Sequence, residues 1–314
     1  MHHQDILTAA HHLITSFTHL LSPLTDEQLA ARNKGLERYN LGEFLDAESD
    51  LTIAAMAGDS DAQYALGEVT QRSAGTINDA AKAWYRLAGE QSHVYALMRL
   101  GDVNSLAKAR KLAQNLVDVD DADAMLQMYE LTKDTYWLSR AGAAGNGEAL
   151  YLQAILSERT PELRNSPNGN TKLDTLLIRS ANLGFPPAMQ WLERRPYFAL
   201  NAGFQTAMLS KRLEKNQLSA VMAYAYALLQ VFVDKSDKNR YNVRRDKIKG
   251  YGLLWLVVNS TRQYIRHSEA AQTLETITAT LNAEQIEAGK KFANDWKKQH
   301  PPLSAYNLTY SELK

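Results

Sequence analysis

Residues 58–67 read GDSDAQYALG, and four later stretches repeat this pattern around a central alanine. The five central alanines are Ala62, Ala96, Ala124, Ala149 and Ala188. Four residues before them stand small or turn-forming residues, which are Gly58, Ser92, Asp120, Gly145 and Gly184. Glycine at this position suits the left-handed residue that ends a helix, and the alanine then lets the next helix approach closely. The pattern therefore predicts helix–turn–helix units.

Apolar residues recur at fixed distances before these alanines. Eleven residues before them stand Leu51, Tyr85, Ala113, Leu138 and Leu177, and eight before them stand Ala54, Ala88, Leu116, Ala141 and Ser180. Such positions share one face of a helix. A single unit cannot bury this face alone, so the units must stack. We predict an all-α fold, namely an α-solenoid of stacked antiparallel helix pairs with helical N- and C-terminal caps.

These residues resemble the Sel1-like repeat family, a relative of the tetratricopeptide repeats. The resemblance is carried by AQYALG at 62–67, by Ala83-Trp84-Tyr85 with Ala88, and by Tyr136-Trp137-Leu138 with Ala141. It covers roughly residues 31–192. The resemblance implies a non-catalytic scaffold or adaptor that binds one protein or peptide on a concave or charged face. Members of this family include regulators and immunity proteins that neutralise one partner protein.

The two ends of the chain have a different character. Residues 6–21 place apolar side chains on one helical stripe, which predicts an amphipathic cap in a domain of residues 1–30. Thr25 with Gln28 predicts a capping box at the start of the following helix. No alanine-centred turn is recognised beyond residue 198, although helical patterns continue, with one buried helix at 249–267 and another that begins at Asn282. The predicted domains are therefore 1–30, the solenoid at 31–198 and a C-terminal helical cap at 199–314.

The net charge of zero conceals an uneven distribution. Residues 43–162 carry 10 Lys and Arg against 19 Asp and Glu, whereas residues 163–314 carry 22 against 12. Opposite charge in two regions can steer a charged partner. Six residues after the first three alanines stand Glu68, Asp102 and Glu130, with Arg99 and Gln127 beside them. These five residues are candidates for a partner-binding ladder, and the alternative is a solvated face.

A basic segment at 235–249 supplies the remaining candidate residues. Its partner-binding candidates are Lys235, Lys238, Arg240, Arg244, Arg245 and Lys247. We interpret the segment as an electrostatic contact for an acidic protein. Nucleic-acid binding is an alternative in which the cations contact phosphates and Tyr241 stacks on a base. An exposed loop between two buried helices is the plainest reading.

Catalytic motifs are not recognisable in the sequence. The chain has no cysteine, and nothing resembles a phosphate loop, a nucleophile elbow or a paired-carboxylate motif. Five of the eight histidines lie within the first 19 residues, but their spacing does not suit one shared metal ion. We therefore expect no catalytic residues, no cofactor and no metal. An enzyme-like relative directed at peptidoglycan or β-lactams is the alternative, because some proteins of this family have been linked to such ligands.

The compartment depends on where the natural chain begins. No stretch approaches the ~18 apolar residues that a membrane-spanning helix needs. We expect a cytoplasmic protein if residue 1 is the natural start, and a periplasmic one if a leader has been removed.

Overall fold

A computed structural model describes residues 23–165, 169–195, 198, 201–231, 241–262 and 264–305. The chain forms two compact units, whose described parts are residues 23–144 and residues 145–305. The predicted cap at residues 1–30 lies mostly outside the described residues, and the boundary at residue 198 stays a prediction. Among the described helices, none has both the length and the apolar character needed to cross a membrane.

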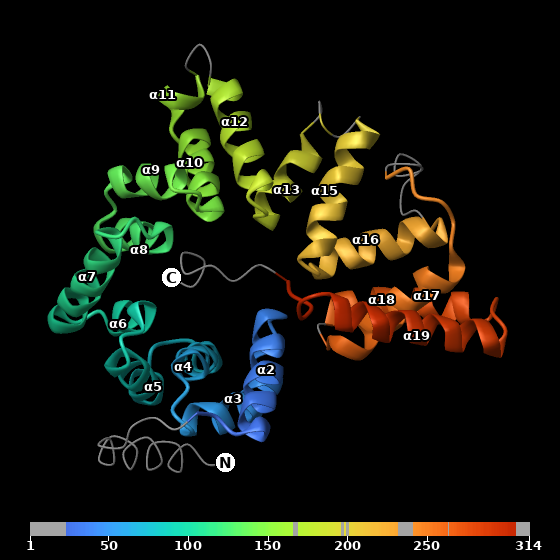
Figure 1. Ribbon diagram of the computed structural model, residues 1–314, viewed down its shortest axis with the longest axis horizontal. Helices are drawn as coiled ribbons and strands as arrows, with labels where there is room; N and C mark the ends of the chain where they lie inside the picture. The colour runs from blue at the N-terminus through green and yellow to red at the C-terminus, as the bar shows by residue number, and fades with distance from the viewer. Residues whose placement is uncertain are drawn as a thin grey trace. The chain divides into compact units, whose positions relative to one another are not determined.

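The first unit is a run of helices in which each packs on the one before it (Figure 1). The helices are α2 (Asp26–Asn40), α3 (Phe44–Met56), α4 (Ser60–Ala74), α5 (Asp79–Glu90), α6 (Val94–Leu100), α7 (Val103–Val117), α8 (Ala122–Thr132) and α9 (Thr135–Ala143). Such nearest-neighbour packing is the signature of stacked helix pairs.

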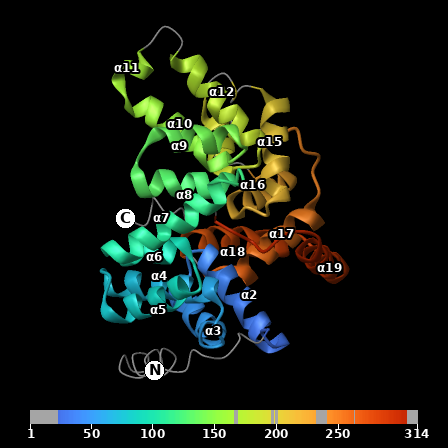
Figure 2. The same cartoon turned by 60° about the vertical axis from the view of Figure 1, so that its left-hand side comes forward.

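The second unit continues the same principle and ends in a tighter cluster (Figure 2). Its helices are α10 (Gly147–Arg159), α11 (Pro161–Arg164), α12 (Gly169–Asn182), α13 (Pro186–Arg194), α15 (Ala202–Glu214), α16 (Leu218–Leu229), α17 (Lys247–Ser260), α18 (Tyr264–Thr278) and α19 (Ala283–Gln299). Helix α17 packs on α16, α18 and α19. A side chain at Gly252 would collide with the carbonyl of Gly289, so two glycines let α17 and α19 touch. The predicted all-α solenoid is confirmed.

The alanine-centred turns are built as the sequence predicts. Each of the five alanines is the third residue of its helix, and each residue four positions earlier has a positive φ between 61° and 98°. At the first turn the N–H of Asp59 bonds to the carbonyl of Ala54, and the N–H of Gly58 bonds to that of Ala55, both at 3.1 Å. This pair of bonds is a Schellman motif. The side chain of Asp59 also accepts the N–H of Ala62 at 2.8 Å, which caps the next helix.

A sixth turn of this kind, between α15 and α16, is not apparent from the sequence. Asn216 has φ 48°, and its N–H bonds to the carbonyl of Leu213 at 2.8 Å. Gln217 bonds to the carbonyl of Arg212 at 3.1 Å, and Ala220 is then the third residue of α16 and fully buried. The predicted boundary at residue 198 stays a prediction, but the structure contains one turn of this kind beyond it that the alanine pattern does not identify. An asparagine takes the left-handed conformation here, and asparagine is less distinctive in a sequence than glycine.

The core follows the predicted stripe with one exception. All five residues eleven positions before the alanines are buried, but Leu116 is 46% exposed. Helix α7 instead buries Ala109, Ala113 and Val117, which follow each other at intervals of four residues. At the last turn of α7, the buried residue is therefore Val117 and not the predicted Leu116.

The predictions of helix ends in the remaining regions are partly confirmed. The capping boxes at Thr25 with Gln28, and at Asn282 with Gln285, are confirmed. The single helix predicted at 249–267 is wrong, because α17 ends at Ser260 and α18 begins at Tyr264. Thr261 is buried in an extended conformation between them, which stops the helix.

Candidate functional site

The acidic residues of the predicted ladder lie in three different environments. Glu68 and Glu130 are buried, whereas Asp102 caps the start of α7 by accepting the N–H of Ser105 at 3.0 Å. Hydrogen bonds from Ser105, led by its hydroxyl, lower the pKa of Asp102. Glu130 pairs with Lys133 at 2.5 Å. Gln127 has a buried Oε1 without a hydrogen-bond partner among the described residues. The structure brings these residues into no common solvated face, and their role in partner binding stays a prediction.

Glu68 and Arg99 form an ion pair inside the first unit. The Nε of Arg99 donates to Oε1 of Glu68 at 2.6 Å, and the hydroxyl of Tyr85 donates to the same oxygen at 2.8 Å. Burial, together with the Glu68 charge, raises the pKa of Tyr85 and of Tyr39 well above the ordinary value. Both hydroxyls therefore stay protonated at neutral pH. Glu68, Tyr85 and Arg99 thus link α4, α5 and α6. The sequence pattern alone places these charges on the surface.

The basic segment is described only in its second half. Lys235, Lys238 and Arg240 lie outside the described residues. Arg244 and Arg245 are exposed in the loop that leads into α17, and Lys247 approaches the hydroxyl of Thr280 at 3.4 Å. These arginines stand at the rim of a cavity.

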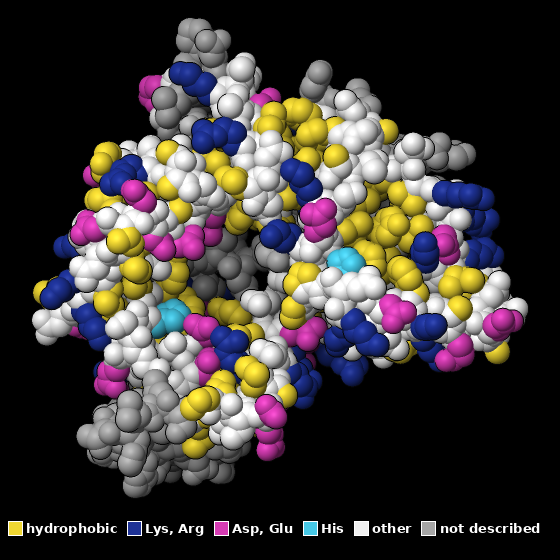
Figure 3. Space-filling model, viewed as in Figure 1, with side chains coloured by type: hydrophobic (Ala, Val, Ile, Leu, Met, Phe, Trp, Pro, Cys, Tyr) yellow, Lys and Arg dark blue, Asp and Glu magenta, His cyan; other side chains and the backbone are white. Residues whose placement is uncertain are grey.

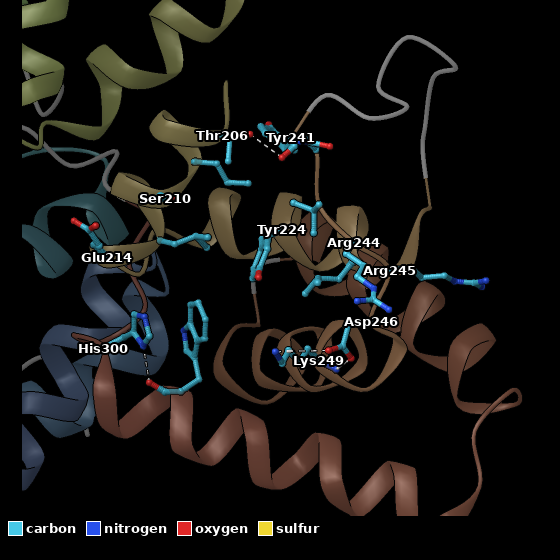
Figure 4. Close-up of a pocket in the computed structure, with 16 residues that line it drawn as sticks. Thr206, Ser210, Glu214, Tyr224, Tyr241, Arg244, Arg245, Asp246, Lys249 and His300 are labelled. Atoms are coloured by element: carbon cyan, nitrogen blue, oxygen red, sulfur yellow. Dashed lines mark hydrogen bonds and ion pairs between the residues drawn. The ribbon is translucent and has the colours of Figure 1, made fainter. Parts of the chain in front are cut away.

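A cavity of about 830 Å³ lies in the second unit between α15, α16, α17, α19 and the loop at 241–246. Its apolar wall consists of Leu209, Leu213, Tyr224, Leu228 and Trp296. Figure 3 shows hydrophobic side chains gathered over this region, with Lys and Arg at its margin. In the close-up, Ser210 and Glu214 lie on one side of Tyr224 and the two arginines on the other (Figure 4). The cavity thus combines an apolar wall with a charged rim.

Asn216 holds the wall of the cavity in place. Its Oδ1 accepts the indole N–H of Trp296 at 2.9 Å, and its Nδ2 donates to the carbonyl of Pro301 at 2.8 Å. The ring of His300 stacks on Trp296, with 3.9 Å between the ring centroids and an angle of 6° between the planes. Ser304 then forms a short parallel bridge with Gln217. The segment after α19 is therefore fastened to the sixth turn, and Trp296 is fixed from two sides.

The loop at 241–246 is attached at both of its ends. The carbonyl of Tyr241 accepts the hydroxyl of Thr206 at 2.7 Å, and the N–H of Asp246 bonds to the carbonyl of Leu228 at 2.9 Å. Asp246 also caps α17 by accepting the N–H of Lys249. Between these anchors the backbone is irregular and lies along the cavity.

The charges at the rim are not balanced. Asp246 lies 3.7 Å from the Nζ of Lys249, which offsets both charges. Within the described part of the chain, no carboxylate lies within ion-pair distance of Arg244 or Arg245. Glu214 is the other acid of the cavity and comes from α15. The arginine side of the rim therefore carries a positive potential.

A second cavity of about 480 Å³ surrounds a buried ion pair. Nη1 of Arg212 lies 2.7 Å and 2.6 Å from the two carboxylate oxygens of Glu193. The same guanidinium donates to Gln217 at 2.6 Å and to Ser219 at 2.9 Å. The donors of Arg212 are thus engaged within the protein, and the pair joins α13, α15 and α16. The larger cavity is therefore the candidate binding site.

Sequence reasoning identified the two arginines but missed the apolar wall. Leu209, Leu213, Tyr224 and Leu228 read as ordinary core positions of two helices. Trp296 reads as part of the apolar stripe of α19. No local signal shows that these stripes leave a space between them.

Comparisons with known proteins add solved structures alone, because no family model and no curated protein matches the chain. A protective antigen of uropathogenic Escherichia coli with an SLR fold shares 15% identity over 95% of this chain and 80% of that one, with a TM-score of 0.34. A Sel1 repeat protein of Oxalobacter formigenes shares 18% identity over 67% and 96%, with a TM-score of 0.33. PA5086 of Pseudomonas aeruginosa shares 14% over 92% and 88%, with a TM-score of 0.36.

The words SLR fold and Sel1 repeat describe those two proteins. TM-scores and identities this low carry no argument about function. The helix-pair architecture of this chain stands on its own turns and helix order.

Proposed function

We propose that this protein is a non-catalytic helical-repeat scaffold that binds one partner protein. The observation that carries the proposal is the cavity of the second unit. Its apolar wall contains Tyr224 and Trp296, and its rim contains two exposed arginines without a carboxylate partner in the described chain. An apolar centre with a polar rim is the usual anatomy of a protein interface, and tyrosine, tryptophan and arginine dominate its binding energy.

The helix-pair architecture supports the same proposal. Stacked units present an extended surface made of many helices. Regulation or neutralisation of the bound protein is the form of activity that we propose for such a scaffold. The scaffold itself then needs no turnover, and its effect depends on affinity and on which surface of the partner it covers.

The test is isolation of a stoichiometric complex from the native organism, followed by reconstitution from the two purified proteins. Size-exclusion chromatography with light scattering gives the mass of the complex. We expect a defined complex that weakens as the salt concentration rises, because rim charges contribute to association. A chain that forms no reconstituted complex, or that turns over a substrate without a partner, contradicts the proposal.

A further inference from the structure

The loop at the rim of the larger cavity has free backbone groups. Among the described residues, the N–H and carbonyl groups of Val243, Arg244 and Arg245 have no hydrogen-bond partner. The loop is held at Tyr241 and at Asp246, so these groups lie on a fixed backbone. Three residues span at most about 10 Å, at about 3.3 Å per residue in an extended chain. This length is enough to pair with a short stretch of another extended chain.

Two further features of the cavity restrict what such a chain contains. The guanidinium groups of Arg244 and Arg245 favour carboxylates near the loop. The wall formed by Leu209, Leu213 and Leu228 favours an aliphatic or aromatic side chain inside the cavity. Tyr224 and Trp296 also offer stacking surfaces for nucleic-acid bases, but the three leucines beside them offer no contact for phosphate or sugar, so a peptide side chain fits better.

The geometry points to an extended acidic peptide segment of the partner as the occupant, with its backbone paired to residues 243–245 and one large apolar side chain in the cavity. This inference rests on the proposed function and names the chemistry that the scaffold recognises. The acids of the segment lie against Arg244 and Arg245. Glu214, on the α15 side of the cavity, excludes further acids there and so sets the direction of the segment.

The experiment measures fluorescence anisotropy of labelled peptides with the full chain. The probe is an acetylated peptide with the sequence GEDEFSSG and a fluorescein label, so its acids lie on one side of the phenylalanine. Three altered probes separate the contributions: phenylalanine replaced by glycine, all acids replaced by lysine, and N-methylation of alternate backbone amides. We expect saturable binding of the unaltered probe. Replacing the phenylalanine, or replacing the acids, should each lower the affinity about tenfold or more. N-methylation should weaken binding about fivefold, because it removes backbone donors.

Variants of the protein test the site itself. The double variant Arg244→Glu/Arg245→Glu should weaken binding about tenfold or more. The matched control is Lys297→Glu/Lys298→Glu, which makes the same charge change at exposed residues of α19 that do not line the cavity. The control should change the Kd less than about twofold. Circular dichroism melts verify that both variants are folded.

Several results overturn the inference. They are absence of saturable binding, equal losses in the two double variants, and equal binding of the glycine-substituted probe. Tighter binding of a labelled oligothymidylate than of the peptide through these arginines also overturns it. So does a self-association of the chain that blocks peptide binding and that Arg244→Glu/Arg245→Glu abolishes. A native partner that binds this variant with unchanged affinity leaves the scaffold proposal standing and refutes the cavity as its recognition site.

Discussion

Removal of Arg99 provides the sharpest test of the core of the first unit. Glu68 is 1% exposed, and the side chain of Arg99 is 4% exposed. Replacement of Arg99 by methionine keeps a long unbranched side chain but removes the positive charge. Glu68 then retains the hydroxyl of Tyr85 as a donor, while water has almost no access to the carboxylate. Removing one partner of a buried ion pair costs about 3–5 kcal/mol, because the other charge is left uncompensated.

Urea unfolding followed by far-UV circular dichroism measures this cost. With a slope of about 2 kcal/mol per molar urea, the loss lowers the midpoint by roughly 1.5–2.5 M. The cycle Arg99→Met, Glu68→Gln and the double variant isolates the interaction between the two side chains. The double variant should be more stable than Arg99→Met alone, because it contains no unpaired charge. Arg140→Met is the control, since its pair with Asp120 is exposed and contributes at most about 1 kcal/mol.

Two outcomes would refute this reasoning. One is a loss below about 1 kcal/mol in Arg99→Met. The other is a double variant that loses the sum of the two single losses, which would mean that the charges do not interact.

The other predictions concern one close contact, one turn and one histidine. Gly67→Ala should lower the melting temperature, and it should lower the free energy of unfolding by more than about 2 kcal/mol, because the new Cβ would lie 2.5 Å from a ring carbon of buried Tyr85. Its control is Gly203→Ala in an exposed part of α15, which should be neutral or stabilising in the same melt. Asn216→Gly keeps the positive φ but removes two hydrogen bonds at the cavity, so urea titration should show a loss of about 2 kcal/mol together with changed tryptophan fluorescence. Burial lowers the pKa of His93, so the unfolded chain binds the proton more tightly than the folded chain. The contribution of neutral His93 to the free energy of unfolding is therefore fully present above the unfolded pKa of about 6.5, and it falls as the pH drops toward the lower folded pKa. His93→Asn preserves the cap and should flatten this decline in melts from pH 7.5 to 5, and an unchanged slope would contradict the assignment.

The repeat fold was predictable because its determinants are local. A left-handed residue, a cap and a small third residue occupy a few consecutive positions, so each turn appears in the sequence as a unit. The prediction erred at Leu116, where the buried face of α7 continues through Val117 instead. The turn fixes where a helix ends, but packing against the neighbouring helices decides which side of its last turn is buried.

The candidate site was predictable only in its charges. Arg244 and Arg245 stand in a basic run that any reading of composition finds. Trp296 is held in the cavity wall by its hydrogen bond to Asn216, which lies 80 positions earlier in the chain. No local sequence pattern predicts that contact. Glu68 and Arg99 are separated by 31 positions, so their burial as a pair also follows from tertiary packing. The periodic pattern of acids predicted a ladder of partner-binding residues or a solvated face, and the structure buries two of its members, Glu68 and Arg99, as an ion pair.

Two of the three non-glycine residues at these turns, Asp120 and Asn216, take part in further contacts. A residue with a Cβ costs roughly 1–2 kcal/mol in the left-handed conformation, and contacts of its side chain offset part of this cost. Asn216 has such contacts, because its amide bonds to Trp296 and to the carbonyl of Pro301. Asp120 pairs with Arg140 at 3.2 Å, and this exposed pair offsets at most about 1 kcal/mol of the cost. Glycine at position 216 would form the same turn but would leave the wall of the cavity without its support. Hence the turn that the alanine pattern fails to reveal is also the one that shapes the candidate site.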